Sequence, residues 1–357
     1  MRIGIPKEIK PLERRIALVP SAVRELIKSK NEVLVETNAG VASGYEDKEY
    51  RQAGAEIVAS AAELYAQARI IVKVKEPIAP EFEFLHKDHT LFSYLHLAAN
   101  PRLTSILQEK GLTAVAFETV ENNGKLPLLA PMSDIAGRLA VHIGTNLLQS
   151  PHGGRGILLG GLPATERGHV VILGAGEAGG NAARVAAGLG AKVTVFARNR
   201  ESLERMYLLG PNVTALTSHE SAIAAAVAKA DLLIGAVLIP GALAPHIVSA
   251  EMVRRMKPGS VIVDIAIDQG GCIETIHATD YTHPTYIEYG VIHFAVTNMP
   301  SAVPRTASQA LSSVLTPYVL KLAQGGPSDA LFHNGINVMA GRVVHPAVSQ
   351  ALAGSMG

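Results

Sequence analysis

Short apolar runs rich in Val and Ile alternate with amphipathic stretches along residues 1–133. The short runs predict strands, and apolar positions spaced by three and four predict helices. The predicted strands are Arg2–Ile5, Glu32–Glu36, Glu56–Val58, Ile70–Val74, Thr90–Leu95 and Thr113–Phe117. The predicted helices are Ser21–Lys30, Asp47–Ala53, Ala59–Ala68 and Pro101–Lys110. Strands that alternate with helices predict a parallel α/β sheet.

A second alternation begins near His169 and predicts up to six parallel strands. Its strands are expected around Val170–Ile172 and at Lys192–Phe196, Val213–Leu216, Leu232–Val237, Ser260–Ile267 and Val291–Val296, with helices at Ser218–Ala230 and Ala250–Met256. Two longer helical patterns flank this region, Asp134–Gln149 and Val303–Gln324. Ser133 is the expected N-cap of the first pattern. We expect the first pattern to cross between domains and the second to return the chain to the first domain.

A glycine-rich turn interrupts the second alternation after its first strand. Gly174, Gly176 and Gly179 form G-x-G-x-x-G between that strand and an Ala-rich helical pattern ending at Leu189. In this context the three glycines permit a tight turn, the approach of a pyrophosphate, and close packing of helix on strand. The free N–H groups at the helix start would face the phosphates. The sequence therefore predicts a dinucleotide-binding domain.

The length of 357 residues favours more than one hydrophobic core. We predict an α/β protein with two Rossmann-like doubly wound domains, the first of them discontinuous, joined by two long helices. The predicted substrate domain comprises residues 1–133 and 303–357, and the predicted dinucleotide domain comprises residues 134–302.

The end of the second strand of the dinucleotide domain lacks the Asp or Glu that usually holds the ribose hydroxyls of NAD. Ala197 and Arg198 stand there instead. A small residue followed by Arg suits a 2′-phosphate, because a guanidinium pairs bidentately with phosphate. Arg198 and Arg200 could equally be the solvated start of a helix. The strand end therefore leaves NAD and NADP both open.

Composition narrows the partners. The net charge is +1 without a basic cluster, which argues against nucleic acid. The single cysteine, Cys272, excludes an intramolecular disulfide framework and suits a reducing compartment. The N-terminus lacks the apolar core of a signal peptide, and no apolar run approaches membrane-spanning length. We expect a cytoplasmic protein, without a metal site because the histidines lack ligand spacing.

Charged side chains at predicted strand ends suggest the chemistry. Arg15 directly precedes an apolar segment. Lys75 and His96 lie at the carboxyl ends of two predicted strands, which is where open α/β sheets bind ligands. Asp268 is expected just past a strand, on a Gly-Gly loop at the crevice between the domains. Bland alternatives remain: Lys73 and Lys75 as gatekeepers of an edge strand, and His96 as a core histidine. Cys272 is expected to be an inert thiol.

Dispersed motifs add a family resemblance along essentially the whole chain. MRIGIPKEIKPLERRIALVP, KVKEP, YLHLA, FETV, PMSDIAGRLA, GGRGILLGG, GAVLIPG, VDIAIDQGGC and VTNMPSAVPRT resemble bacterial L-alanine dehydrogenases. The resemblance implies two Rossmann-like domains, a homohexamer, and reversible NAD-dependent deamination of L-alanine to pyruvate and ammonium. It also implies that Arg15 and Lys75 bind substrate, and that His96 and Asp268 perform acid–base catalysis.

The same resemblance implies the cofactor contacts. They are Ser133, Glu177, Ala178, Ser218, Val237, Leu238, Asn298 and Met299. The pattern of the chain adds the glycine motif, Ala197 and Arg198 at the strand end, and Asp268 as further candidate cofactor contacts. Three positions differ from the family: Ala197 stands where the family usually has Asp, Ser202 where it can have Lys, and His277 where it can have Arg. These differences bear on the choice between NAD and NADP.

Three other functions share this fold. A saccharopine-type dehydrogenase differs in the size of its substrate. The nucleotide-binding component of a transhydrogenase moves hydride only between nucleotides, and a redox-sensing protein only binds them. The last two would not need Lys75, His96 and Asp268 together.

Overall fold

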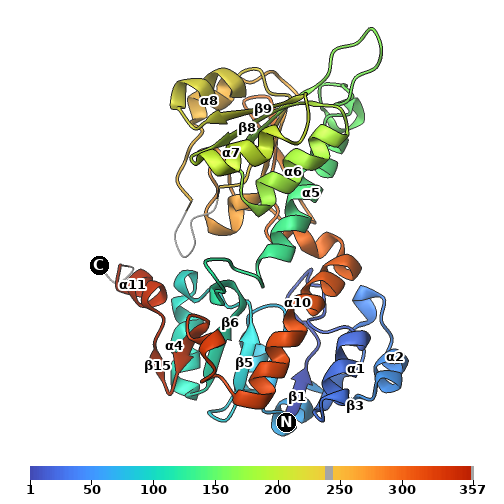
Figure 1. Cartoon of the computed structure of the whole chain (residues 1–357), viewed down its shortest axis with the longest axis vertical. Coiled ribbons are helices and arrows are strands. Elements are labelled where there is room, and N and C mark those ends of the chain that lie inside the picture. The colour runs from blue at the N-terminus through green and yellow to red at the C-terminus, as the bar shows by residue number, and fades with distance from the viewer. Residues whose placement is uncertain (238–243, 355–357) are drawn as a thin grey trace. The chain divides into compact units, whose positions relative to one another are not determined.

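A computed structural model describes residues 1–237 and 244–354, and these divide into two compact units (Figure 1). Unit 1 comprises Met1–Met132 and Ser301–Gly357, and unit 2 comprises Ser133–Pro300. The outward passage between the units lies within α5 (Ala130–Leu147). The return lies in a 3-10 turn, Met299–Ala302, immediately before α10 (Pro304–Gly325).

Unit 1 is built on an eight-stranded sheet in the order β15-β14-β6-β5-β4-β1-β2-β3. Its first six strands in sequence are parallel and follow the doubly wound order 3-2-1-4-5-6. They are β1 (Arg2–Ile5), β2 (Glu32–Glu36), β3 (Glu56–Val58), β4 (Ile70–Val72), β5 (Thr90–Ser93) and β6 (Thr113–Ala116). Antiparallel β14 (Ile336–Met339) and β15 (Arg342–Val343) extend one edge.

The helices of unit 1 are α1 (Pro20–Lys28), α2 (Asp47–Ala53), α3 (Ala61–Gln67), α4 (Pro101–Lys110), α10 and α11 (Pro346–Gly354). Helix α10 packs against α1 and carries two serines that hold the segment before α1. The hydroxyls of Ser308 and Ser312 accept from the backbone N–H groups of Ile16 and Val19. The C-terminal part of the chain therefore fixes the segment that bears Arg15.

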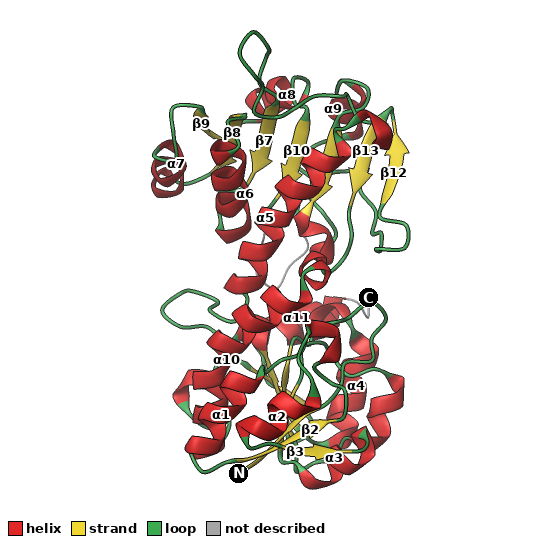
Figure 2. Cartoon of the chain, turned by 90° about the vertical axis from the view of Figure 1, so that its right-hand side faces the viewer, coloured by secondary structure: helices red, strands yellow, loops and turns green. Residues whose placement is uncertain are grey.

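Unit 2 has a seven-stranded sheet in the order β12-β13-β11-β10-β7-β8-β9, which is the same doubly wound order with an added strand. The strands are β7 (His169–Leu173), β8 (Lys192–Ala197), β9 (Val213–Thr217), β10 (Leu232–Gly235), β11 (Val261–Asp264), β12 (Thr285–Glu288) and β13 (Val291–Phe294). Its remaining helices are α6 (Glu177–Gly188), α7 (Arg200–Tyr207), α8 (Glu220–Val227) and α9 (Ala250–Arg254). Figure 2 shows α5 and α6 in front of these strands.

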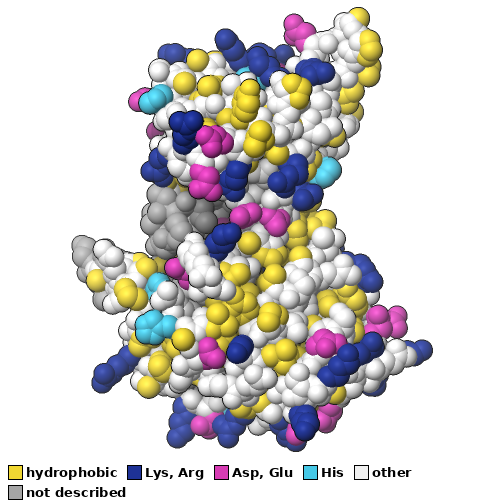
Figure 3. Space-filling model, viewed as in Figure 1, with side chains coloured by type: hydrophobic (Ala, Val, Ile, Leu, Met, Phe, Trp, Pro, Cys, Tyr) yellow, Lys and Arg dark blue, Asp and Glu magenta, His cyan; other side chains and the backbone are white. Residues whose placement is uncertain are grey.

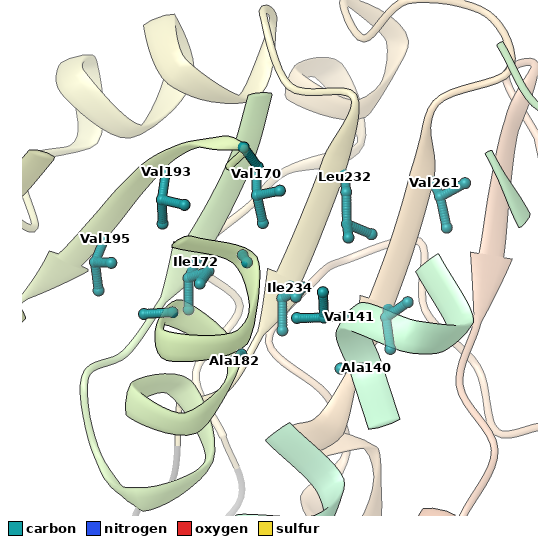
Figure 4. Close-up of a cluster of buried hydrophobic side chains, with 14 of the residues drawn as sticks. Ala140, Val141, Val170, Ile172, Ala182, Val193, Val195, Leu232, Ile234 and Val261 are labelled. Carbon is teal, nitrogen blue, oxygen red and sulfur yellow. The ribbon is translucent and has the colours of Figure 1, made fainter. Parts of the chain in front are cut away.

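The core of unit 2 explains why its strands read as continuous apolar runs. Successive residues of a strand point to opposite faces, and both faces are covered. Val170 and Ile172 face α5 and α6, together with Ala140 and Ala182 of these helices (Figure 4). Val171 and Leu173 face a second cluster that includes Val253 of α9.

Several predicted boundaries were wrong. Ser133 does not cap a helix, because α5 begins at Ala130. The predicted strand Ser260–Ile267 ends at Asp264 and continues as a 3-10 helix, Ile265–Gln269, so Asp268 lies in that helix. The strands β12, β14 and β15 were missed: they are short antiparallel additions, and two of them are partly exposed. Tertiary pairing, rather than local apolar patterning, stabilises such strands.

Helices α5 and α6 approach each other closely at Gly137. A methyl group there would lie 2.0 Å from the carbonyl oxygen of Ala178. We expect Gly137→Ala to lower the free energy of unfolding by about 1–3 kcal/mol, the usual cost of overpacking. Gly188→Ala, near the end of α6, has nothing within 4 Å of the new methyl. It should leave stability unchanged or raise it by up to about 1 kcal/mol. Thermal unfolding of both variants tests this, and an equal effect of the two would contradict it.

Candidate functional site

The glycine loop of unit 2 joins β7 to α6. Gly174 has φ of +100°, and a methyl there would lie 2.5 Å from the carbonyl oxygen of Ala236. A methyl on Gly179 would lie 1.9 Å from the carbonyl oxygen of Gly174. A methyl on Gly176, in contrast, would have nothing within 4 Å, so the space beside this residue is open. Two glycines therefore permit internal packing, and one faces open space at the start of α6.

The second strand end lies beside this loop in the sheet, because β8 pairs with β7. Ala197 is buried as the last residue of β8, and its carbonyl accepts from the N–H of Ser218. Arg198 is exposed and precedes Asn199, the N-cap of α7. Arg200 is 91% exposed and pairs with Glu204 on the same helix. Arg200 therefore fits the solvated helix start, whereas both interpretations of Arg198 stay open.

Arg205 was not singled out from the sequence and lies close to the glycine loop. Its guanidinium donates to the carbonyl oxygen of Ala175 at 3.4 Å and to the hydroxyl of Ser202 at 3.2 Å. A second guanidinium is thus present near the end of β8. Arg205 lies on α7, and only the packing of that helix brings it to the loop.

Asp268 is exposed on the 3-10 helix that follows β11. One of its carboxylate oxygens accepts from the backbone N–H of Asn298, at 3.3 Å, and Asn298 has a left-handed φ of +63°. The next carbonyl, of Met299, accepts from the hydroxyl of Tyr281. The structure therefore brings Asp268, Asn298 and Met299 together. Val237 follows β10 and is half-buried, whereas Leu238 lies outside the described residues.

The residues of unit 2 fit a dinucleotide. Glu177 and Ala178 begin α6, whose first N–H groups have no partner within the helix and suit a phosphate. The open space at Gly176 adjoins them. The buried side-chain oxygen of Gln269, next to Asp268, finds no hydrogen-bond donor among the described residues. It could accept from a hydroxyl or amide of a bound ligand.

In unit 1, Arg15 is fixed by a carboxylate two residues before it. Its guanidinium donates to both oxygens of Glu13, at 2.8 and 2.6 Å, and both side chains are almost fully buried. The same guanidinium contacts the sulfur of Met132 at 3.1 Å. The Glu13 charge raises the pKa of Arg15 against the opposing effect of burial, so the side chain is a preorganised cation.

Lys75 follows β4 and is buried, with no hydrogen bond or ion pair from its ammonium to any residue that the structure describes. Its backbone is held by Glu8, whose carboxylate accepts from the N–H groups of Val74 and Lys75. Glu8 also lies 3.5 Å from the ammonium of Lys73, which pairs with Glu81 as well. Burial raises the pKa of Glu8 to about 7, and Lys73 opposes that rise.

His96 follows β5 in a left-handed conformation with φ of +49°. The Glu118 carboxylate accepts hydrogen bonds from the backbone N–H groups of Leu95 and His96. The distance from the His96 nitrogen to the carboxylate oxygen is 2.6 Å. The same carboxylate lies 4.0 Å from Nδ1 of the His96 imidazole. Tyr94 stacks against that ring with 6.1 Å between centroids. The backbone N–H of Tyr94 donates to the carbonyl of Val74, which ties the His96 segment to the Lys75 segment.

The bland interpretations of these side chains were wrong. Strand β4 lies between β1 and β5, so Lys73 and Lys75 do not guard an edge. The side chain of His96 is 43% exposed, so it is not a core histidine. The sequence did not predict that Glu8, Glu118 and Asp264 hold the backbone of the segments that carry the candidate residues. The only signal in the sequence was a carboxylate next to an apolar run. Cys272 is buried, and burial raises the pKa of its thiol, as expected of an inert cysteine.

The described residues show neither a membrane-spanning helix nor a metal-binding cluster. No helix of residues 1–237 and 244–354 is long and apolar enough to cross a membrane. The same residues contain no group of three or more His, Cys, Asp or Glu side chains that could hold a metal ion. On the face drawn in Figure 3, Lys and Arg are interspersed with Asp and Glu in each unit.

Both parts of the chain match one protein family. Residues 4–136 match the domain described as "Alanine dehydrogenase/PNT, N-terminal domain", and residues 140–346 match "Alanine dehydrogenase/PNT, C-terminal domain". The chain belongs to the alanine dehydrogenase/PNT family. The resemblance found in the sequence motifs is therefore confirmed.

Individual members of the alanine dehydrogenase/PNT family are similar over the full chain. An alanine dehydrogenase of Bacillus subtilis (strain 168) is 50% identical over 99% of this chain and 95% of its own length. A solved L-alanine dehydrogenase covers 99% of both chains with 52% identity and a TM-score of 0.95. A solved transhydrogenase from Sinorhizobium meliloti has 28% identity and a TM-score of 0.85 over 97% of this chain and 100% of its own. The predicted fold class is confirmed.

The Glu13–Arg15 pair provides a stability test. Glu13→Ala would remove the carboxylate from a buried guanidinium, and we expect a loss of about 3–5 kcal/mol in the free energy of unfolding. Glu25→Ala removes the partner of Lys28 from an exposed pair and should cost less than about 1 kcal/mol. Thermal and urea unfolding of both variants measure the difference. Similar losses in the two variants would show that Glu13 does not stabilise Arg15.

Proposed function

We propose that the chain catalyses the reversible oxidative deamination of L-alanine to pyruvate and ammonium, with NAD as hydride acceptor. The observation that carries this proposal is the arrangement of Arg15, Lys75 and His96 on adjoining segments of unit 1. Glu13, Glu8 and Glu118 hold these segments. The identity of about one half to alanine dehydrogenases supports the choice of substrate.

We assign substrate binding to two of the buried cations of unit 1, Arg15 and Lys75. A guanidinium held by a carboxylate, and an ammonium that makes no hydrogen bond or ion pair with a described residue, can bind the carboxylate and carbonyl oxygens of pyruvate. Arg15 and Lys75 have these properties among the described residues. Because both are buried, their attraction for an anion is stronger than it would be in water.

Proton transfer is assigned to His96. The alanine ammonium must lose a proton before Cα can release hydride, and the iminium that forms must then add water. An imidazole suits both transfers because imidazoles titrate near neutral pH. Glu118, 4.0 Å from Nδ1, lies where it can orient the ring.

We assign to Asp268 the stabilisation of the positive charge that develops on the substrate nitrogen. Its exposed carboxylate can stabilise an iminium and orient the attacking water. A bound nicotinamide would supply the acceptor for the hydride that leaves Cα of the amino acid. Gly174, Gly176, Gly179, Glu177 and Ala178 would hold its pyrophosphate. Ser133, Ala197, Arg198, Ser218, Val237, Leu238, Asn298 and Met299 are the other proposed contacts.

The remaining assignments rest on the family. We propose a homohexamer acting in the cytoplasm, as the resemblance to bacterial alanine dehydrogenases implies. The small-molecule partners would be L-alanine, pyruvate and ammonium. Residues 1–133 and 303–357 would form the substrate domain, and residues 134–302 the cofactor domain.

Turnover by the purified chain tests the reaction. We expect alanine-dependent formation of NADH and reductive amination of pyruvate. His96→Ala and Asp268→Ala should each lower kcat by roughly a hundredfold or more, the scale of acid–base catalysis for the histidine and of electrostatic stabilisation for the aspartate. Lys75→Ala should raise KM for pyruvate as well as lower the rate.

Three results would redirect the assignment. Nucleotide binding without alanine turnover would favour a transhydrogenase-like or redox-sensing function. Turnover confined to larger amino acids would favour a saccharopine-type enzyme. A kcat close to that of the wild type in His96→Ala would make the histidine structural.

The cofactor choice is tested at Ala197. We propose that NAD is used and that discrimination against NADP is weak, because Ala197 offers no negative charge to repel a 2′-phosphate and Arg198 could pair with it. Ala197→Asp should selectively lower kcat/KM for NADP, since like charges in close contact repel. Glu201→Asp, an exposed change on α7, is a control that preserves charge. An unchanged NADP/NAD ratio in Ala197→Asp would show that this strand end does not contact the ribose.

A further inference from the structure

Asp264 is a fully buried carboxylate at the end of β11, with no cationic partner among the described residues. Burying an unpaired carboxylate is costly unless hydrogen bonds compensate it. Burial raises the pKa of Asp264 to about 6, so the group is mainly ionised at neutral pH. Both oxygens can then accept hydrogen bonds.

The hydrogen bonds of Asp264 go to the two ends of one loop. Oδ1 accepts from the N–H of Ala266 at 2.8 Å, and Oδ2 accepts from the N–H of Cys272 at 2.8 Å. Ala266 and Cys272 bound the loop 266–272, and the residues between them include Asp268. One buried carboxylate thus closes the loop that presents the exposed carboxylate.

The surroundings leave little room for Asp264 to move. A methyl on Gly235 would lie 2.8 Å from Oδ1, and a methyl on Gly271 would lie 3.0 Å from Oδ2. The thiol of Cys272 lies 3.9 Å from Oδ1. The carboxylate is therefore enclosed by backbone, and a change in its hydrogen bonding must be accommodated by the loop.

We propose that Asp264 is a positioning residue that holds Asp268 in place by anchoring both ends of the loop 266–272. The inference rests on the proposed function for the role of Asp268, and on the hydrogen bonds alone for the anchoring. An amide at this position offers one acceptor oxygen, and its NH₂ group would face the second N–H. Asp264→Asn should therefore release one end of the loop while preserving size.

The test compares Asp264→Asn with Asp231→Asn. Asp231 is a buried carboxylate at the opposite end of the same sheet, before β10, where it accepts from the N–H of His169 and pairs with Arg155 and Lys257. Amide hydrogen exchange should quicken in residues 265–273 of Asp264→Asn only. Its kcat should fall about ten- to hundredfold, the usual effect of a misplaced catalytic group. Its NADH affinity, measured by fluorescence, should fall by a smaller factor than its kcat, because the glycine loop is untouched and Asp268 is one of many proposed cofactor contacts.

A double-mutant cycle separates positioning from general damage. In the background of Asp268→Ala, Asp264→Asn should lower kcat no further, because its effect acts through the missing side chain. A full additional loss of kcat in that background would overturn the proposal. So would unchanged exchange in the loop, or faster exchange with wild-type kcat.

Hydrogen exchange tests the anchoring even when alanine turnover is absent or the variant does not fold. If the wild type does not turn over alanine, the proposed function fails, and the exchange of residues 265–273 still decides the anchoring.

If Asp264→Asn does not fold, the wild type is measured at pH 5 and pH 7, with correction for intrinsic exchange. Protection of the loop should fall at pH 5 relative to β7, because Asp264 is then protonated. Cys272 and Tyr286, the titratable groups that interact with it, stay neutral throughout this range. Equal protection at the two pH values would overturn the anchoring.

Discussion

Buried carboxylates that accept backbone N–H groups beyond the ends of central strands fix the segments on which the proposed chemistry depends. A strand end in a parallel sheet leaves backbone donors without a neighbouring strand, and burial makes an unpaired donor costly. Glu8 accepts from Val74 and Lys75, and Glu118 accepts from Leu95 and His96. Asp264 does the same for Ala266 and Cys272. In each case the carboxylate fixes the backbone of a segment that carries a proposed site residue: Lys75, His96 or Asp268.

The two units share one strand order but differ in the turn after the first strand. In unit 2 the turn after the first strand is the glycine loop, which leaves open space at Gly176. In unit 1 the turn after β1 carries Glu8, Glu13 and Arg15 in its place, and these are buried charges. A glycine turn exposes backbone donors to a phosphate, whereas a turn of paired charges holds a guanidinium for a carboxylate. This difference is the basis for proposing that unit 2 binds the cofactor and unit 1 the substrate.

Charge pairing in unit 1 also has a cost. Lys73, Glu8 and Glu81 are almost entirely buried, and Glu8 has a pKa raised to about 7 by that burial. Apolar residues of equal size could fill such a space with no loss of solvation. The cluster gives unit 1 something that apolar packing cannot, namely an acceptor for the N–H groups beside Lys75. Buried polar networks of this kind specify one arrangement of the chain.

The amino-acid sequence by itself determined the alternation of strands and helices, the glycine turn, and the positions of Arg15, Lys75, His96 and Asp268. These features are local: they depend on apolar periodicity, on the conformational freedom of glycine, and on motifs that resemble one family. Tertiary structure alone decided which strands are central, that β12, β14 and β15 exist, and that Ser133 lies inside a helix. It also decided which carboxylates support the site. Glu8 and Val74, or Glu118 and His96, are far apart in sequence, and only the pairing of neighbouring strands makes one the hydrogen-bond acceptor of the other.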